Sequence, residues 1–256
     1  MLMALFIACH KQTELPNHEC YIPIHAGKKI SGKMLDQVLG DDTGNNISCK
    51  NKNYCELTVI YWLWKNKLFN DDYIGLVHYR RYFGNVLSNF KFKEVKIYDR
   101  ANISNKMKQY DIIIPVKESL KLSVVEHYRK FHNVEELMLA KKIVDKLYPD
   151  YSAAFRELLE QKKISLYNMF IMKAGIFDCY CDWLFSILDE LEKEINLCRY
   201  DEYQSRVFGF IAERLLNVWI NKNKEVFKVG EEFVINTDEC SGRGAQLISQ
   251  LRAKLK

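Results

Sequence analysis

The sequence predicts an α/β fold in which a mainly parallel sheet is flanked by helices and is followed by a more helical C-terminal half. In the first half, short apolar segments alternate with helix-like segments, which is typical of a parallel sheet. In the second half, apolar residues recur at helical spacing. The 256 residues, 48% hydrophobic and 28% charged, are sufficient for one large domain with a substantial core.

The strands expected in the first half are short apolar runs that end at polar residues or at proline. They occupy residues 1–9, 73–77 and 111–115. Asn53 is expected to cap a helix over residues 54–66, because the apolar side chains of that segment fall on one face. The Lys- and Asn-rich stretch 85–109 is expected to be a connector.

The second half is predicted to be mostly helical. Helices are expected over residues 119–131, 134–147, 151–162, 176–195 and 203–221. Strand-like runs occupy residues 164–172, which carry Asn168 in their middle, and residues 231–235. The tail from Gly242 is basic with leucines on one side, so we expect it either to lie on an anionic membrane or to pack on this domain or a partner subunit.

The composition narrows the class of protein. A net charge of +5 favours an anionic ligand. Eight cysteines without a CxxC pair are typical of reduced thiols, and the first residues lack the features of a signal peptide, so a cytoplasmic protein is expected. P-loop, dinucleotide-binding, α/β-hydrolase and zincin motifs are absent from the sequence. The lysines are spread out instead of interleaved with aromatic residues, which does not favour nucleic-acid binding.

Residues 73–83 carry the strongest functional signal. An apolar strand runs directly into His78, Arg80 and Arg81. Ligands of open α/β sheets bind beyond the carboxyl ends of the strands, and arginine pairs bidentately with phosphate oxygens. We therefore predict an anion-binding site at this strand end; the alternative is a solvated pair of surface arginines.

Polar residues also follow the first strand and a short segment that ends at Gly40, where a further strand is expected to stop. Asp41 and Asp42 can accept hydrogen bonds from a ribose or a uracil, or coordinate a divalent ion, although an Asp/Gly turn is the simpler interpretation. His10 and Lys11 close the first strand; Lys11 is either a phosphate contact or a solvated lysine, and His10 taken alone is more simply a hydrogen-bonded structural residue. Because the carboxyl ends of parallel strands meet at one edge, these residues are expected to face the same crevice as the arginines.

Four more residues are candidates for a site. Asn51 is either a helix cap or a ligand contact. Asn168 lies in an apolar run and therefore needs a backbone, turn or ligand partner. Arg206 and Glu213 lie in an apolar helix, where a carboxylate can have a raised pKa suited to proton abstraction; an ordinary Glu213–Arg214 surface pair is the alternative.

Several of these residues belong to longer motifs that resemble the DUF4422 family. The motifs lie at residues 10–11, 41–48, 50–51, 54–58, 61–62, 64–66, 75–83, 168–172, 183–185 and 206–216. Members of the family are bacterial glycosyltransferases of capsule, exopolysaccharide and O-antigen synthesis, and some are galactofuranosyltransferases. The resemblance spans about residues 3–222.

The resemblance implies a GT-A-like (Rossmann-type) fold and a different role for each of three segments of the chain. Residues 1–118 would bind a nucleotide-sugar, residues 119–238 would form the acceptor side of the same domain, and residues 239–256 would be the basic tail, a candidate for peripheral membrane contact. The implied donor is a UDP-sugar carrying galactofuranose or another hexose. The implied acceptor is lipid-linked or an oligosaccharide, and no nucleic acid is implied as a partner.

Many GT-A enzymes have an Asp-x-Asp metal motif where this chain has His78, Arg80 and Arg81. We therefore expect these residues, with Lys11, to stabilise the departing diphosphate in an inverting transfer without a resident metal. Mg²⁺ or Mn²⁺ bound by the carboxylates at 41–42 is the alternative.

We hypothesise roles for the other candidates in such a transfer. These are donor binding for His10, Lys11, Asp41, Asp42 and Asn51, the general base for Glu213, and substrate contacts for Tyr79, Asn168 and Arg206. Two other classes of function stay open at this point: a non-catalytic sugar-binding or scaffold subunit of a polysaccharide assembly complex, and a nucleic-acid-binding protein.

Overall fold

The computed structural model describes residues 3–33, 35–36, 38–68 and 72–239. Within these residues, the main sheet has nine strands, seven of them in the order β12-β8-β11-β4-β1-β2-β3, while β5 pairs with β4 and β13 with β5. The strands are β1 (Met3–Cys9), β2 (Tyr21–His25), β3 (Leu39–Gly40), β4 (Tyr73–His78), β5 (Arg81–Phe83), β8 (Ile112–Pro115), β11 (Phe170–Lys173), β12 (Val229–Glu232) and β13 (Val234–Asn236).

The directions of the strands show which edge of the sheet is suited to ligand binding. β1 is parallel to both β2 and β4, and β2 is parallel to β3. The carboxyl ends of these four strands therefore meet at the same edge. β11 is antiparallel to its neighbours β4 and β8, while β8 and β12 are parallel, so the sheet is mixed and mainly parallel, as predicted.

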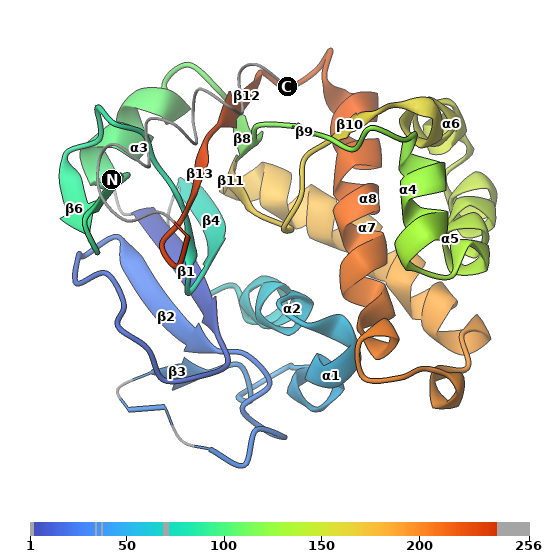
Figure 1. Ribbon diagram of the computed structural model, residues 1–256, viewed down its shortest axis with the longest axis horizontal. Helices are drawn as coiled ribbons and strands as arrows, with labels where there is room; N and C mark the ends of the chain where they lie inside the picture. Colours follow the sequence, from blue (N-terminus) through green and yellow to red (C-terminus); the bar gives the residue numbers. More distant parts are fainter. Residues whose placement is uncertain (1–2, 34, 37, 69–71, 240–256) are drawn as a thin grey trace.

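Helices cover both faces of the sheet (Figure 1). Side chains of α3 pack with one face, next to Leu5 and Val77, and side chains of α2, α7 and α8 pack with the other, next to Phe6 and Leu76. α4 to α8 gather on that second side and form the helical half of the molecule (Figure 1). The helices are α1 (Asn51–Tyr54), α2 (Leu57–Asn66), α3 (Arg100–Met107), α4 (Val124–Phe131), α5 (Val134–Leu147), α6 (Ser152–Glu160), α7 (Ala174–Glu194) and α8 (Val207–Asn223).

The helix predicted over residues 54–66 is interrupted. Cys55 has φ +51°, which ends α1, and α2 starts two residues later. Asn53 lies inside α1 instead of capping it, and its amide donates to the carbonyl of Ser205 at 2.8 Å. The interruption lets the chain turn at the sheet edge, where a continuous helix was expected.

Other corrections concern the short elements. The segment 85–109 contains a hairpin, β6 (Phe90–Phe92) with β7 (Val95–Ile97), and the capped helix α3. The run 164–172 is split into β10 (Lys163–Ile164), which pairs with β9 (Glu118–Ser119), and β11. The late strand is two strands, β12 and β13. The predicted basic tail lies outside the described residues.

Candidate active site

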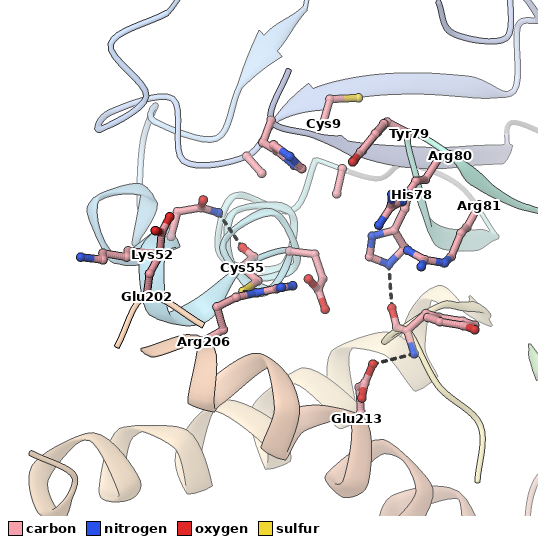
Figure 2. A pocket seen from close by; sticks show the side chains of 16 residues that line it. Cys9, Lys52, Cys55, His78, Tyr79, Arg80, Arg81, Glu202, Arg206 and Glu213 are labelled. Carbon is pink, nitrogen blue, oxygen red and sulfur yellow. Dashed lines mark hydrogen bonds between the residues drawn. The ribbon is translucent and has the colours of Figure 1, made fainter. Parts of the chain in front are cut away.

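A pocket of about 640 Å³ opens at the carboxyl ends of β1 and β4 (Figure 2). His78 pairs with Arg81 across β4 and β5, which leaves Tyr79 and Arg80 as the two residues of a tight turn. Most of the predicted site residues line the pocket: His10, Asn51, His78, Tyr79, Arg80, Arg81, Arg206 and Glu213. The sheet edge and α8 thus bring together residues that lie far apart in the sequence.

Three arginines supply positive charge to the pocket. The guanidinium of Arg81 lies 4.5 Å from the ring centre of Tyr167, and that of Arg206 donates from Nε to the sulfur of Cys55 at 3.3 Å. In the described part of the chain, neither of these two arginines forms an ion pair. Arg80 has a long, partly exposed contact with Asp238, at 3.8 Å between Nη1 and Oδ2, and its buried Nε has no partner there. These donors are therefore available to an anionic ligand.

The backbone of Tyr167, a residue that lines the pocket, connects its two sides. Its N–H donates to Oε1 of Glu213 at 2.8 Å, and its carbonyl accepts from Nε2 of His78 at 2.6 Å. A carbonyl only accepts, so Nε2 carries the proton. Burial lowers the pKa of His78, and the nearby Glu56 charge opposes this shift. The hydrogen bond from His78 helps to orient this turn.

Glu213, the predicted base, has both oxygens engaged. Oε1 accepts from Tyr167, and Oε2 accepts from Nη1 of the buried Arg214 at 2.8 Å. Burial raises the pKa of Glu213, although the Arg214 charge opposes this shift. The carboxylate is well suited to fixing the Tyr167 turn, since each of its oxygens accepts one hydrogen bond from the protein.

Glu56 is a pocket residue that the sequence reasoning missed. Its Oε1 accepts from the amide of Asn168 at 2.6 Å. Asn168 itself is 2% exposed and stays outside the pocket lining, so the expected substrate contact is a support for Glu56 instead. The only signal for Glu56 in the sequence is its place in the motif 54–58, which resembles the family.

Asp41, Asp42 and Lys11 lie outside the pocket lining. Asp41 has no exposed surface and accepts four hydrogen bonds from the protein. Asp42 lies 3.7 Å from Nζ of Lys28, and Nζ of Lys11 lies 5.1 Å from the ring centre of Tyr79. The carboxylate pair therefore does not share the crevice of the arginines as expected.

Asn51 and His10 are pocket residues with protein partners. The amide of Asn51 donates to the carbonyl of Cys55 at 2.7 Å and to Oγ1 of Thr58 at 3.0 Å, which holds the break between α1 and α2. His10 lies edge-on to Tyr79, with 5.0 Å between ring centres. Burial and the nearby cations lower the pKa of His10.

Among the residues that the structure describes, no three His, Cys, Asp or Glu side chains converge in a way that would hold a metal ion. No helix in that part of the chain has both the length and the hydrophobicity needed to cross a membrane.

Comparison with known proteins supports the predicted resemblance. The DUF4422 family model, described as a domain of unknown function, matches residues 4–224. The chain is also similar to the apo structure of WbbM, a bifunctional glycosyltransferase, at 34% identity and a TM-score of 0.83, which confirms the GT-A-like α/β fold. The similarity covers 91% of this chain and 45% of that chain, so this chain spans less than half of its length. No curated protein matches.

Proposed function

We propose that this chain, which belongs to the DUF4422 family, is a glycosyltransferase that moves a sugar from a nucleotide-sugar to a growing bacterial surface polysaccharide. Membership of the family and the similarity to WbbM support this proposal. A UDP-sugar carrying galactofuranose or another hexose is the donor that we favour, on the basis of the family resemblance. The acceptor is a lipid-linked or free oligosaccharide.

One observation carries the proposal: the turn between β4 and β5 presents Arg80 and Arg81 at the carboxyl edge of the parallel strands, inside a pocket large enough for a ligand. In glycosyl transfer, the diphosphate gains negative charge as the bond to the sugar breaks. Fixed guanidinium groups aimed at the diphosphate stabilise this charge more in the transition state than in the ground state. Arg206 approaches the same pocket from the opposite side (Figure 2).

Donor binding is expected to stabilise the protein. UDP at a hundred times its dissociation constant should raise the melting temperature by roughly 5–10 °C, because binding to the folded state alone adds about 2.7 kcal/mol. A thermal-shift series with UDP, GDP, CMP and dTDP, each with EDTA or with Mg²⁺, measures nucleotide preference and metal need together. A series without any shift would contradict the proposed donor class, and turnover of a UDP-sugar separates an enzyme from a non-catalytic sugar-binding subunit.

We propose that the acceptor enters beside Arg206, where aromatic side chains continue from the pocket rim. Tyr203 lies next in sequence to the pocket residue Glu202, is 52% exposed, and packs against His132 and Phe210 at ring distances of 5.9 and 5.2 Å. Such exposed aromatic faces suit stacking against a sugar ring.

Replacing Tyr203 by alanine is expected to raise KM for the acceptor about tenfold, the value of one lost aromatic contact. KM for the donor should stay unchanged. Steady-state kinetics with each substrate varied in turn measure both constants. Leu87→Ala is the matched control, since Leu87 is an 81% exposed apolar side chain outside the pocket lining. If Tyr203→Ala and Leu87→Ala had the same KM for the acceptor, Tyr203 would not be part of the acceptor site.

A further inference from the structure

The backbone places Glu56 at a fixed point of the pocket wall. Cys55 adopts φ +51°, a conformation that is unusual for a residue with a side chain, and Asn51 holds its carbonyl with a 2.7 Å hydrogen bond. The carbonyl of Glu56 then accepts from the N–H groups of Val59 and Ile60, at 3.1 and 3.3 Å, in the first turn of α2. The residue therefore has little freedom to leave the pocket.

Asn168 fixes the side chain of Glu56. This asparagine is 2% exposed and has φ +50°, and its amide group donates both to Oε1 of Glu56 at 2.6 Å and to the carbonyl of Gly209 at 3.1 Å. Two acceptors face the amide nitrogen, so the orientation of the amide is determined. One oxygen of Glu56 is thereby held, and in the described part of the chain the other oxygen, Oε2, has no protein partner.

Groups of both signs lie near Glu56. Burial lowers the pKa of His78, and the nearby negative charge of Glu56 opposes that shift. Arg206 and Glu213 also lie within electrostatic reach of Glu56. The two pocket carboxylates thus differ in one decisive respect: Glu213 uses both oxygens to bind Tyr167 and Arg214, whereas Glu56 keeps one oxygen free.

We propose that Glu56, and not Glu213, is the catalytic base of the transfer, and that Asn168 is its positioning residue. This inference rests on the proposed function. Oε2 of Glu56 takes the proton of the acceptor hydroxyl while the hydroxyl oxygen forms a bond to the anomeric carbon of the donor sugar. The bond from that carbon to the diphosphate oxygen breaks, and its electron pair leaves with the diphosphate beside Arg80 and Arg81. Glu56 later releases the proton to water. The anomeric configuration is inverted.

Glu56→Gln tests the base. With UDP-galactofuranose as donor and an octyl galactoside as acceptor, kcat should fall by about 10²–10⁴-fold, the usual contribution of a positioned base. The dissociation constant of UDP should stay within about twofold, since a base holds no part of the leaving group. The competing variant is Glu213→Gln. If Glu213→Gln loses kcat and Glu56→Gln does not, the assignment is overturned, and so it is if the product keeps the anomeric configuration of the donor.

Azide supplies an independent test, because it attacks carbon without losing a proton. Glu56→Ala incubated with donor and sodium azide should form a glycosyl azide, detected by mass spectrometry, faster than it transfers sugar to the octyl galactoside. Absence of glycosyl azide from a variant that still binds UDP would contradict the proposal. If the wild-type protein neither binds UDP nor transfers sugar, the proposed function has failed; if it does both and Glu56→Gln matches it, only this inference has failed.

The positioning role is tested with Asn168→Gly, because glycine adopts the positive φ of this residue without strain. This variant should lose about tenfold or more in kcat, in line with the cost of other supporting contacts at active sites. Residues that act through one another show non-additive effects. The double variant with Glu56→Gln should therefore be no slower than Glu56→Gln alone, and fully additive losses would mean that Asn168 supports the fold independently of Glu56.

Discussion

Arg81→Ala is expected to lower kcat for sugar transfer by about 10²–10³-fold, the usual cost of one lost donor to transition-state charge. Arg81 lines the pocket, lies 4.5 Å from the ring of Tyr167, and has no carboxylate within ion-pair distance in the described chain. The charge of Arg81 is therefore not neutralised by a carboxylate in the described part of the chain. The loss should appear in kcat more than in KM, because the diphosphate becomes more negative as the sugar departs. The rate of UDP release at saturating donor and acceptor measures kcat.

Two further variants separate charge from geometry. Arg81→Lys keeps the charge but lacks the planar fork, so an intermediate loss is expected. Arg100→Ala is the matched control: Arg100 is a partly exposed arginine on α3 that pairs with Glu19 at 3.2 Å, and it lies outside the pocket lining. A near-normal rate for Arg81→Ala, or an equal loss for Arg100→Ala, would contradict a role for Arg81 in leaving-group stabilisation.

The strand ends of the site were predictable from the sequence. An apolar run that stops at His78, followed by Tyr79 and two arginines, indicates that the chain emerges at the edge of the sheet. The first strand likewise ends before His10. Because parallel strands share a carboxyl edge, two local patterns were enough to bring His10 and Arg80 into one pocket.

The residues that organise the site were not predictable in the same way. Cys55, Tyr167 and Asn168 have φ values of +51°, +78° and +50°. None of them is glycine, the residue that usually indicates positive φ in a sequence. Periodicity therefore favoured one continuous helix and one continuous strand. The contact of Asn168 with Glu56 joins residues 112 positions apart, and no local pattern records such a distance.

Asp41 shows the same limit. A carboxylate after a short strand suggests either a turn or a ligand contact, and the sequence around it does not separate them. Its partners decide the question: the N–H groups of Gly27 and Lys28 donate to it at 2.8 and 3.2 Å, and the hydroxyls of Ser48 and Thr58 donate at 2.5 and 2.6 Å. Asp41 therefore ties the loops after β2 and β3 to the start of α2.

Asp41→Ala is expected to destabilise the fold by about 3–5 kcal/mol. The substitution leaves two backbone N–H groups and the Ser48 hydroxyl without an acceptor in a site with no solvent exposure, and each such group costs about 1–3 kcal/mol. The hydroxyl of Thr58 loses less, because it also donates to the carbonyl of Cys55 at 3.1 Å. Denaturation in urea at unchanged m-value measures the difference.

Asp42→Ala is the neighbouring control, since Asp42 makes only a 3.7 Å contact with the partly exposed Lys28, worth about 1 kcal/mol or less. Equal losses from the two variants would contradict the structural assignment of Asp41.

The loss of Asp41 should also affect the pocket wall that carries Glu56. Thr58 and Asn51 share a 3.0 Å hydrogen bond, and Asn51 holds the carbonyl of Cys55, next to Glu56. Asp41→Ala that stays folded in the cold should therefore retain UDP binding through the arginines while transfer is impaired, because the wall carrying Glu56 loses its anchor.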